Sequence, residues 1–519
     1  MKRALLGGLG IGAAAVILVA AAGSLWWPYG EDQGQLAHVG DVILAGQMPH
    51  RDVWDNNSPG TALQEVALRL VGGRSQLPLR VLDLLYLGGS CLALYVLGRR
   101  LHSPLAGAAA AAAWAATYLT LYGWDGFWCT AQRDGWAAML GAMALALAVR
   151  GRPGSGVVAG VLVGMAALFK PLYAGLLLPV LVLAWETQEG PRSARRAGAA
   201  AGEVVAGMAL ATLPVLLWLA GGHALGAAWE QIVIFRSQVY LARVDTSFLG
   251  LVREVGHRVL RGYYSGQYRP LSLPLVLLGA VGWWSLQRTR PAGRVALAWI
   301  LPVGAMGALL VQGRILAYHW WPLLLSISLL GGVGFAALVS GLPRLAPRSG
   351  VALAVALGVA GAGLVPPAQV AVRQARYYWG APSGERQRPE LYADCMQVVA
   401  GYLRSRTDPG TPVQVWSVPA IVYFLADRPG ATASPLGWEM RLAAATATDL
   451  HDRYARRFLA EMEAKQPPYF VYTGDELTSG EPLIWQYLIQ KYQYERVLEA
   501  PSWEPDQGLI RFTVLRRRR

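Results

Sequence analysis

The chain is dominated by repeated apolar runs, most of them about as long as a membrane-crossing helix. A bilayer core needs about 20 apolar residues per helix, so these runs predict a polytopic α-helical membrane protein. Hydrophobic residues make up 54% of the 519 residues, and charged residues make up 15%, against roughly 25% in soluble domains. We expect helices near residues 4–27, 78–98, 103–121, 135–149, 156–169, 171–185, 198–220, 271–287, 295–311, 318–340 and 350–369.

The apolar run 156–185 has two interpretations, because Lys170-Pro171 interrupts it. Proline disfavours helix in the residue before it and removes one helical hydrogen bond. If this run forms two helices, the Lys and Arg residues of the short loops gather on one side, as the positive-inside bias predicts for the cytoplasmic side. A single tilted helix spoils that bias, so we expect two helices here and eleven spans in all.

The first helix begins like a signal peptide, with Lys2-Arg3 followed by apolar residues. Its apolar run is long for a signal peptide and ends in Trp26-Trp27-Pro28-Tyr29, an aromatic anchor of the kind found at membrane interfaces. We therefore expect a retained helix in a bacterial-type inner (plasma) membrane. The charge bias places the N-terminus in the cytoplasm and the C-terminal residues outside it.

The pattern changes near residue 371, which divides the chain into a transmembrane domain, 1–370, and an extracytoplasmic α/β domain, 371–519. Residues 28–77 and 221–270 are outer loops in this scheme, and 228–241 suits a helix lying in the membrane interface. Periodicity in the last domain predicts helices at 391–406 and 449–465, and strands at 413–417, 469–472 and 509–515.

The net charge of +14 does not indicate a nucleic-acid partner, because most Lys and Arg residues lie in short loops between apolar runs. The three cysteines form no metal or disulfide pattern. Phosphate-binding and dinucleotide-binding glycine motifs are missing, as is the His-Glu-x-x-His motif of zinc enzymes.

The carboxylates Glu31 and Asp32 follow directly after the first apolar helix. About twenty residues later comes a loop whose sequence indicates a defined conformation, His50-Arg51-Asp52-Val53-Trp54-Asp55-Asn56-Asn57-Ser58-Pro59-Gly60. Carboxylates placed at the edge of a membrane helix suggest a functional site. The alternative is that the pair only hydrates the end of the helix.

These features together resemble the GT-C integral-membrane glycosyltransferases, in particular the family of aminoarabinose transferases and protein mannosyltransferases (glycosyltransferase family 39). Further stretches carry the resemblance: Gln132-Arg133-Asp134, Phe169-Lys170-Pro171, Gly313 to Pro322, and Pro467 to Val471. Relatives often have Lys-Pro where this chain has Asn57-Ser58, so a phosphate contact from this loop is in doubt.

The resemblance implies an enzyme that transfers a sugar from a polyprenyl-phosphate donor, held in the lipid bilayer, to a hydroxyl of a glycan, lipid or protein acceptor. Such a transfer needs a general base near the sugar and cations near the phosphate. The resemblance makes Asp32 the first choice for the base and Glu31 the second.

The candidate cations for the donor phosphate are Lys170, Arg314, His319 and Arg133. Each has a simpler interpretation. Lys170 would extend to the membrane surface, Arg314 and His319 would anchor a turn in the interface, and Arg133 would pair with Asp134.

The candidate substrate-loop residues are Arg51, Asp52, Trp54 and Asp55, and Tyr318 joins them as an aromatic residue that can stack on a sugar. Asp52 and Asp55 can equally order the loop through turns and through pairing with Arg51. No cofactor is certain, and the resemblance leaves open whether a divalent cation takes part.

Two other classes of protein compete with the enzyme. A flippase or transporter of polyprenyl-linked lipids would show charges deep inside spans and repeat symmetry. A non-catalytic subunit of a cell-envelope assembly machine would tolerate the loss of Asp32.

The eleven expected spans predict that tags at the N-terminus and at residue 519 report opposite sides of the membrane, because an odd number of crossings separates them. The measurement is the labelling of each tag in intact and in permeabilised cells. Two tags on the cytoplasmic side would mean that 156–185 crosses the membrane as one helix.

Overall fold

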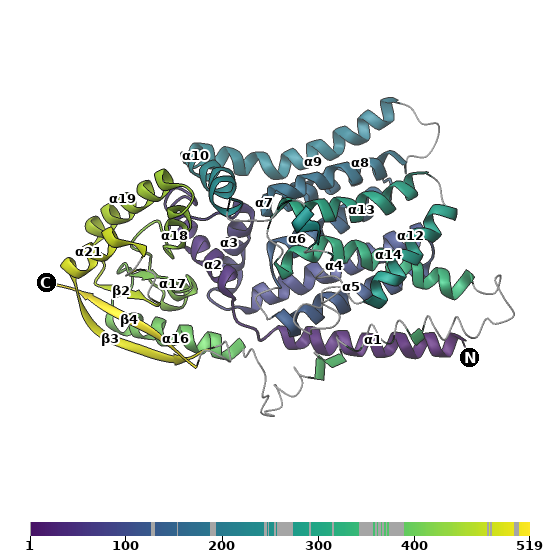
Figure 1. Cartoon of the computed structure of the whole chain (residues 1–519). Helices are drawn as coiled ribbons and strands as arrows, with labels where there is room; N and C mark the ends of the chain where they lie inside the picture. Colours follow the sequence, from purple (N-terminus) through teal and green to yellow (C-terminus); the bar gives the residue numbers. More distant parts are fainter. Residues whose placement is uncertain are drawn as a thin grey trace. The chain divides into compact units, whose positions relative to one another are not determined.

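The computed structural model of the chain is mostly helical, with a small mixed sheet in its C-terminal part (Figure 1). Two compact units are built from interleaved segments. The first unit contains Met1–Trp26, Arg80–Pro214 and Thr246–Ser383, and the second contains Trp27–Leu79, Val215–Asp245 and Gly384–Arg519. The structure describes all residues except 1, 126–129, 153, 187–193, 243–246, 248, 254–255, 257–272, 290–291, 314–315, 342–356, 359–360, 362–364, 366–367, 370, 373–388, 475–476, 478–479 and 503–507.

The first unit consists of apolar helices, and most of the predicted ones are present. They are α1 (Lys2–Ser24), α4 (Leu77–Leu101), α5 (Pro104–Asp125), α6 (Arg133–Ala148), α7 (Ser155–Phe169), α8 (Leu177–Glu186), α9 (Ala194–Gly221), α12 (Leu273–Thr289), α13 (Ala292–Val311) and α14 (Trp321–Gly341), where α4 and α9 cross the unit boundary. The predicted helix at 350–369 lies mostly outside the described residues.

The predicted interruption at Lys170 is present. Helix α7 ends at Phe169, and Lys170 has an extended backbone with φ −160° and ψ 120°. A short 3-10 helix, η2 (Pro171–Leu176), then leads into α8. The chain therefore forms two helices here, as proline in the sequence predicts.

Within the part of the chain that the structure describes, four helices are long and apolar enough to cross a membrane: Ala4–Ser24, Leu77–Leu101, Gly198–Gly221 and Tyr318–Ser340. Shorter apolar helices lie at Ser155–Phe169, Pro171–Ala184 and Leu297–Val311. These helices make a multi-pass membrane protein, while the count of eleven crossings stays a prediction.

Glycine allows the helices of the first unit to pack backbone against backbone. A Cβ added at Gly334 of α14 would lie 1.9 Å from the carbonyl oxygen of Leu278 in α12. A Cβ at Gly160 of α7 would lie 2.0 Å from the carbonyl oxygen of Val204 in α9. Because neither position has room for a methyl group, the abundant glycine of the sequence serves close helix packing, as is common in membranes.

The second unit includes the first stretch predicted as an outer loop, 28–77, and the part of the second stretch up to Asp245, and both contain helices. They are α2 (Glu31–Leu44), α3 (Pro59–Gly72) and α10 (Leu225–Trp229), followed by the π-helical turns η3 (Glu230–Ile234) and η4 (Arg236–Tyr240). Phe235 and Val239 in the predicted interface helix are fully buried against Trp54, Ala443 and Leu450 of the same unit. This apolar face is therefore covered by protein.

The C-terminal part of the second unit is the α/β region that the sequence predicts. Its sheet has the order β1-β2-β4-β3, with β1 parallel to β2 and the other neighbours antiparallel. The elements are α16 (Pro389–Arg406), β1 (Gln414–Trp416), α17 (Ile421–Ala426), α18 (Trp438–Ala444), α19 (Thr448–Lys465), β2 (Tyr469–Tyr472), α21 (Pro482–Lys491), β3 (Tyr492–Pro501) and β4 (Leu509–Arg517).

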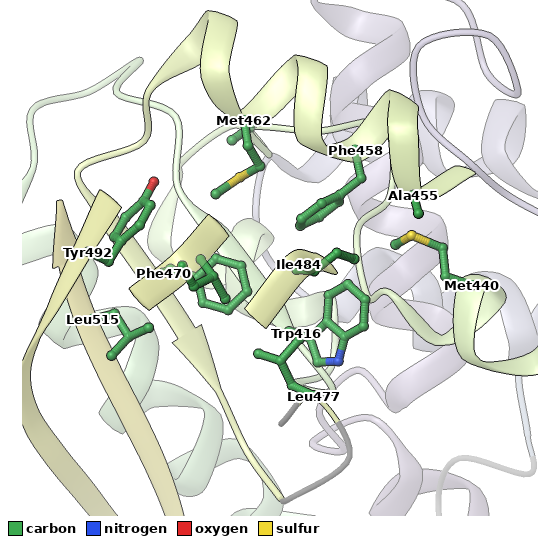
Figure 2. Packing of buried hydrophobic residues seen from close by; sticks show 12 residues of the cluster. Trp416, Met440, Ala455, Phe458, Met462, Phe470, Leu477, Ile484, Tyr492 and Leu515 are labelled. Atoms are coloured by element: carbon green, nitrogen blue, oxygen red, sulfur yellow. The ribbon is translucent and has the colours of Figure 1, made fainter. Parts of the chain in front are cut away.

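The core of this α/β region lies between the sheet and helices α19 and α21. Figure 2 shows Phe458 and Met462 of α19 and Ile484 of α21 among the buried side chains, together with Trp416 and Phe470 of the strands. The rings of Trp416 and Phe458 meet edge to face, with their centroids 5.5 Å apart. This packing gives the α/β region a hydrophobic core of its own.

Candidate active site

The acidic pair Glu31 and Asp32 forms the first turn of α2. The helix start is fixed by Gln33, whose Oε1 accepts a hydrogen bond from the Gly30 N–H at 2.8 Å. Negative charge is favoured at a helix N-terminus, because the backbone N–H groups there point toward it. Glu31 is exposed and Asp32 is half-buried, so the two carboxylates differ in their access to water.

Tyr392 of α16 lies close to this pair and was not singled out in the sequence. Burial, together with the negative charges of Glu31 and Asp32, raises the pKa of the Tyr392 hydroxyl well above its usual value. The phenol therefore stays protonated beside the two carboxylates. No local sequence signal identifies this residue, since it is separated from them by more than 350 positions of the chain.

The loop carboxylates Asp52 and Asp55 order the chain around them. Asp52 forms an ion pair with Arg51, with 2.7 Å between Oδ2 and Nη2, and it accepts the Met48 N–H at 2.8 Å. Asp55 is buried, and its Oδ1 accepts the Asn57 N–H at 3.0 Å and Gln35 Nε2 at 3.3 Å. These contacts match the structural interpretation of both residues.

Gln231 of η3 holds the same loop from another segment of the unit. Its Nε2 donates to the His50 carbonyl at 2.7 Å, and its Oε1 accepts the Asp55 N–H at 3.0 Å. His50 has a left-handed backbone with φ 65°, which is uncommon for a residue with a side chain. The Gln231 side-chain amide donates one of these hydrogen bonds and accepts the other. Together they hold the loop in a conformation that its own sequence does not favour.

Trp54 belongs to an aromatic cluster. Its ring meets Phe235 edge to face at 5.0 Å and Trp438 at 5.2 Å, and it is 4% exposed. The backbone N–H of Trp54 donates to the Ala433 carbonyl at 2.6 Å. Because three segments of the second unit converge on this ring, its main role in the structure is packing.

In the first unit, Lys170 and Asp134 form a buried ion pair. Lys170 Nζ lies 3.0 Å from both carboxylate oxygens of Asp134, and it also contacts Gln312 Oε1. Tyr173 donates its hydroxyl to Asp134 Oδ1 at 2.9 Å. Lys170 is 4% exposed and Asp134 is fully buried, so Lys170 does not extend to a solvated surface in this conformation.

Two other predicted cations, Arg133 and His319, lie near the same carboxylate. Both lie close enough to Asp134 to interact with it electrostatically. The ring of Tyr318 packs edge to face on His319, with centroids 4.8 Å apart. Arg314 lies outside the described residues.

Asp83 of α4 is a buried carboxylate that sequence analysis did not single out. Its Oδ1 accepts the Tyr118 hydroxyl at 2.6 Å and Trp136 Nε1 at 2.8 Å. An acidic residue inside an apolar run is a functional signal in itself, and this signal was present in the sequence. The network joins α4, α5 and α6 through one polar centre.

The described residues hold no group of three or more His, Cys, Asp or Glu side chains that could bind a metal ion. The predicted base belongs to the second unit, whereas the predicted phosphate ligands Lys170, His319 and Arg133 belong to the first.

Residues 59–218 match the family model described as dolichyl-phosphate-mannose-protein mannosyltransferase. Comparison with curated protein sequences finds no significant match. The family match covers part of the apolar helices and begins at Pro59 of the first-loop motif. It supports the family resemblance that was drawn from the sequence motifs.

The structure is similar to ArnT from Cupriavidus metallidurans in the apo state and bound to undecaprenyl phosphate, with TM-scores of 0.58 and 0.59. The identities are 17% and 16%, and each alignment covers 98% of both chains. It is also similar to the oligosaccharyltransferase AglB from Archaeoglobus fulgidus in complex with an inhibitory peptide and a dolichol-phosphate. That match has a TM-score of 0.52, 15% identity, and coverage of 90% of this chain and 70% of the other. These matches show that the chain shares the mostly helical fold of these solved structures, and the number of membrane crossings stays a prediction.

The buried pair predicts that Lys170→Met lowers the stability of the protein by about 3–5 kcal/mol, because it leaves the Asp134 carboxylate without its counter-ion. The double variant Lys170→Met/Asp134→Leu should recover most of that loss. The measurement is thermal unfolding of each purified variant in one detergent.

The matched control is Arg152→Met, which removes an exposed cation from the same unit and should leave stability nearly unchanged. A double variant that is less stable than Lys170→Met would show that the two side chains do not act as a pair.

Proposed function

We propose that this chain is a membrane glycosyltransferase that transfers a sugar from a polyprenyl-phosphate donor to an acceptor hydroxyl on the extracytoplasmic face. The observation that carries the proposal is the family match over 59–218, on a chain whose whole length has the GT-C-like fold. The acidic pair at the start of α2 supplies the carboxylates that such chemistry requires.

The reaction breaks the bond between the anomeric carbon and a phosphate oxygen of the donor, and it forms a bond between that carbon and the acceptor oxygen. The acceptor hydroxyl must lose its proton as the new bond forms, which calls for a general base. Asp32 takes this role in our proposal. Because it is half-buried, its carboxylate is less surrounded by water than that of Glu31, which is exposed.

Tyr392 is a positioning residue for this pair in the proposed mechanism. Its hydroxyl stays protonated because burial and the two carboxylates oppose ionisation. A neutral phenol adds no charge beside the base, and it restricts where water and acceptor can lie. A negatively charged side chain at position 392 would compete with the acceptor for the space beside Glu31 and Asp32.

The leaving phosphate gains negative charge as the sugar departs, and cations lower the energy of that state. We assign this role to Arg133, Arg314 and His319. Lys170 already directs its ammonium at Asp134 and Gln312, so it acts by holding Asp134 in place rather than as the first phosphate ligand.

We expect Asp32→Asn to lower turnover by about 10²–10⁴-fold, the usual contribution of a general base. The substitution keeps the shape of the side chain and removes its proton acceptor. The measurement is transfer of radiolabelled sugar from polyprenyl-phosphate donors to an acceptor panel, with the purified protein.

Asp449→Asn is the matched control, because Asp449 is an exposed carboxylate in the first turn of α19 in the same unit. Its turnover should be unchanged. Normal turnover in Asp32→Asn with an inactive Glu31→Gln would move the role of base to Glu31. Normal turnover in both variants would refute the carboxylate mechanism and favour a lipid transporter or an assembly subunit.

For the donor phosphate, we expect Arg314→Ala and His319→Ala each to weaken carrier binding by about 1.5–3 kcal/mol, the value of a hydrogen bond to a charged group. Arg314→Lys should recover only part of the loss, because lysine lacks the paired donors of the guanidinium. The measurement is the affinity of each variant for polyprenyl phosphate in nanodiscs. Unchanged affinity in the double Ala variant would move the phosphate site to other residues.

A further inference from the structure

A polar pocket lies within the second unit, and none of the proposed catalytic steps uses it. It is lined by His38 and Val42 of α2, by Asp52 and Val53 of the first loop, and by residues of the α/β region that include Gly430, Thr432 and Lys465. The pocket offers about 260 Å³ to the centres of water-sized molecules. A single water needs about 10–15 Å³ on that measure, so the pocket has room for a ligand much larger than one water.

His38 supplies a buried polar group to this pocket. It is 3% exposed, and its ring stacks on Tyr423 with centroids 4.5 Å apart and an angle of 23° between the planes. Within the part of the chain that the structure describes, the His38 ring nitrogens make no hydrogen bond, and they are not among the fully enclosed polar atoms that lack a partner. Because an unsatisfied buried polar group costs free energy, this imidazole is suited to a ligand or ordered water.

The surroundings of His38 favour its neutral form. Burial and, to a lesser degree, the charge of Arg74 lower the pKa of the His38 ring to about 4. The imidazole is therefore neutral at physiological pH and offers one donor and one acceptor. Tyr423 keeps the ring in a fixed plane, so these two groups have fixed directions.

Gly430 leaves open space beside this ring. A Cβ at position 430 would lie 3.5 Å from His38 Nε2, which is ordinary van der Waals contact. The backbone at Gly430 does not have a positive φ, so glycine is not needed there for conformation. The missing side chain therefore keeps the nitrogen accessible, and an added methyl group would cover it without a clash.

Two charged side chains line the pocket, Asp52 and Lys465. Both carboxylate oxygens of Asp52 already accept hydrogen bonds from Arg51. Lys465, at the end of α19, is exposed and so remains hydrated. Thr432 contributes a buried hydroxyl that donates to Gln414 or to the Ser434 carbonyl, and its oxygen can still accept. An anion would require buried cationic donors, whereas these neutral groups suit a ligand rich in hydroxyls.

We propose that this pocket binds a saccharide unit of the acceptor, held by His38 and Thr432, so that the acceptor of the enzyme is a glycan or carries one. The assignment of the saccharide to the acceptor rests on the proposed function. The binding itself does not, because it depends only on the second unit's own residues. His38 acts here as a specificity residue and takes no part in the proton transfer at Asp32.

The test is ligand-detected NMR of the full-length protein in detergent with a panel of methyl glycosides and, separately, with inorganic phosphate. We expect the protein to bind at least one glycoside and not phosphate. His38→Phe keeps a ring against Tyr423 but removes both nitrogens, and it should raise the dissociation constant about three- to tenfold, as for one lost neutral hydrogen bond.

Gly430→Ala should raise the dissociation constant at least as much, because its methyl group covers His38 Nε2. The matched control is Gly401→Ala in α16, where an added Cβ meets nothing within 4 Å, and it should bind as the unaltered protein does. His38→Gln, which restores a donor and an acceptor, should recover part of the affinity.

The outcomes separate this inference from the proposed function. Glycoside binding by the unaltered protein, together with no sugar transfer to any acceptor of the panel, would support the pocket and refute the transferase. An active transferase with unchanged glycoside affinity in both His38→Phe and Gly430→Ala would refute the pocket alone. Binding of phosphate, or of no glycoside in the panel, would also overturn the saccharide assignment.

Discussion

In hydrocarbon, every backbone N–H and C=O must be hydrogen bonded within the protein, and the rest of this structure depends on that constraint. It forces the apolar runs into helices and makes any break in a helix costly. The break at Lys170 is tolerated because the ammonium is paired with the buried Asp134, and because the 3-10 turn that follows satisfies part of the backbone. The same break brings Lys170 and Tyr173 to the Asp134 carboxylate, and Lys170 also contacts Gln312, so a helix interruption becomes a polar centre.

Sequence periodicity predicted the helices well, because apolar length and the Lys170-Pro171 interruption are local properties. It also predicted β1, β2 and β4, whose residues are rich in Val, Tyr and Phe. It missed β3, an edge strand with many exposed side chains, and α17, a short helix that is buried on nearly all sides. Neither shows the clear one-sided pattern that a period of two or of 3.6 residues requires.

In the candidate site too, a pairing between sequence neighbours could be predicted, whereas contacts between distant segments could not. Arg51 and Asp52 are neighbours in sequence, and their pairing was foreseen. Asp134 forms an ion pair with Lys170, which lies 36 positions away at the end of another helix, and no spacing in the sequence indicates that contact. Tyr392 and Gln231 reach their partners only through tertiary folding, and no spacing in the sequence reveals that. The roles of Asp32 and of the phosphate ligands are chemical assignments that the fold makes reasonable.

The interleaving of the second unit has a consequence for the order in which the protein is made. Trp54 is synthesised early, but the residues that cover it, Phe235 and Trp438, leave the ribosome much later. Until the last segment has been made, the first loop presents an aromatic surface to its surroundings, and exposed apolar surface of this kind is what chaperones and proteases recognise. A chain whose synthesis stops early therefore keeps this aromatic surface exposed. Its acidic pair also lacks the neighbours that later segments provide.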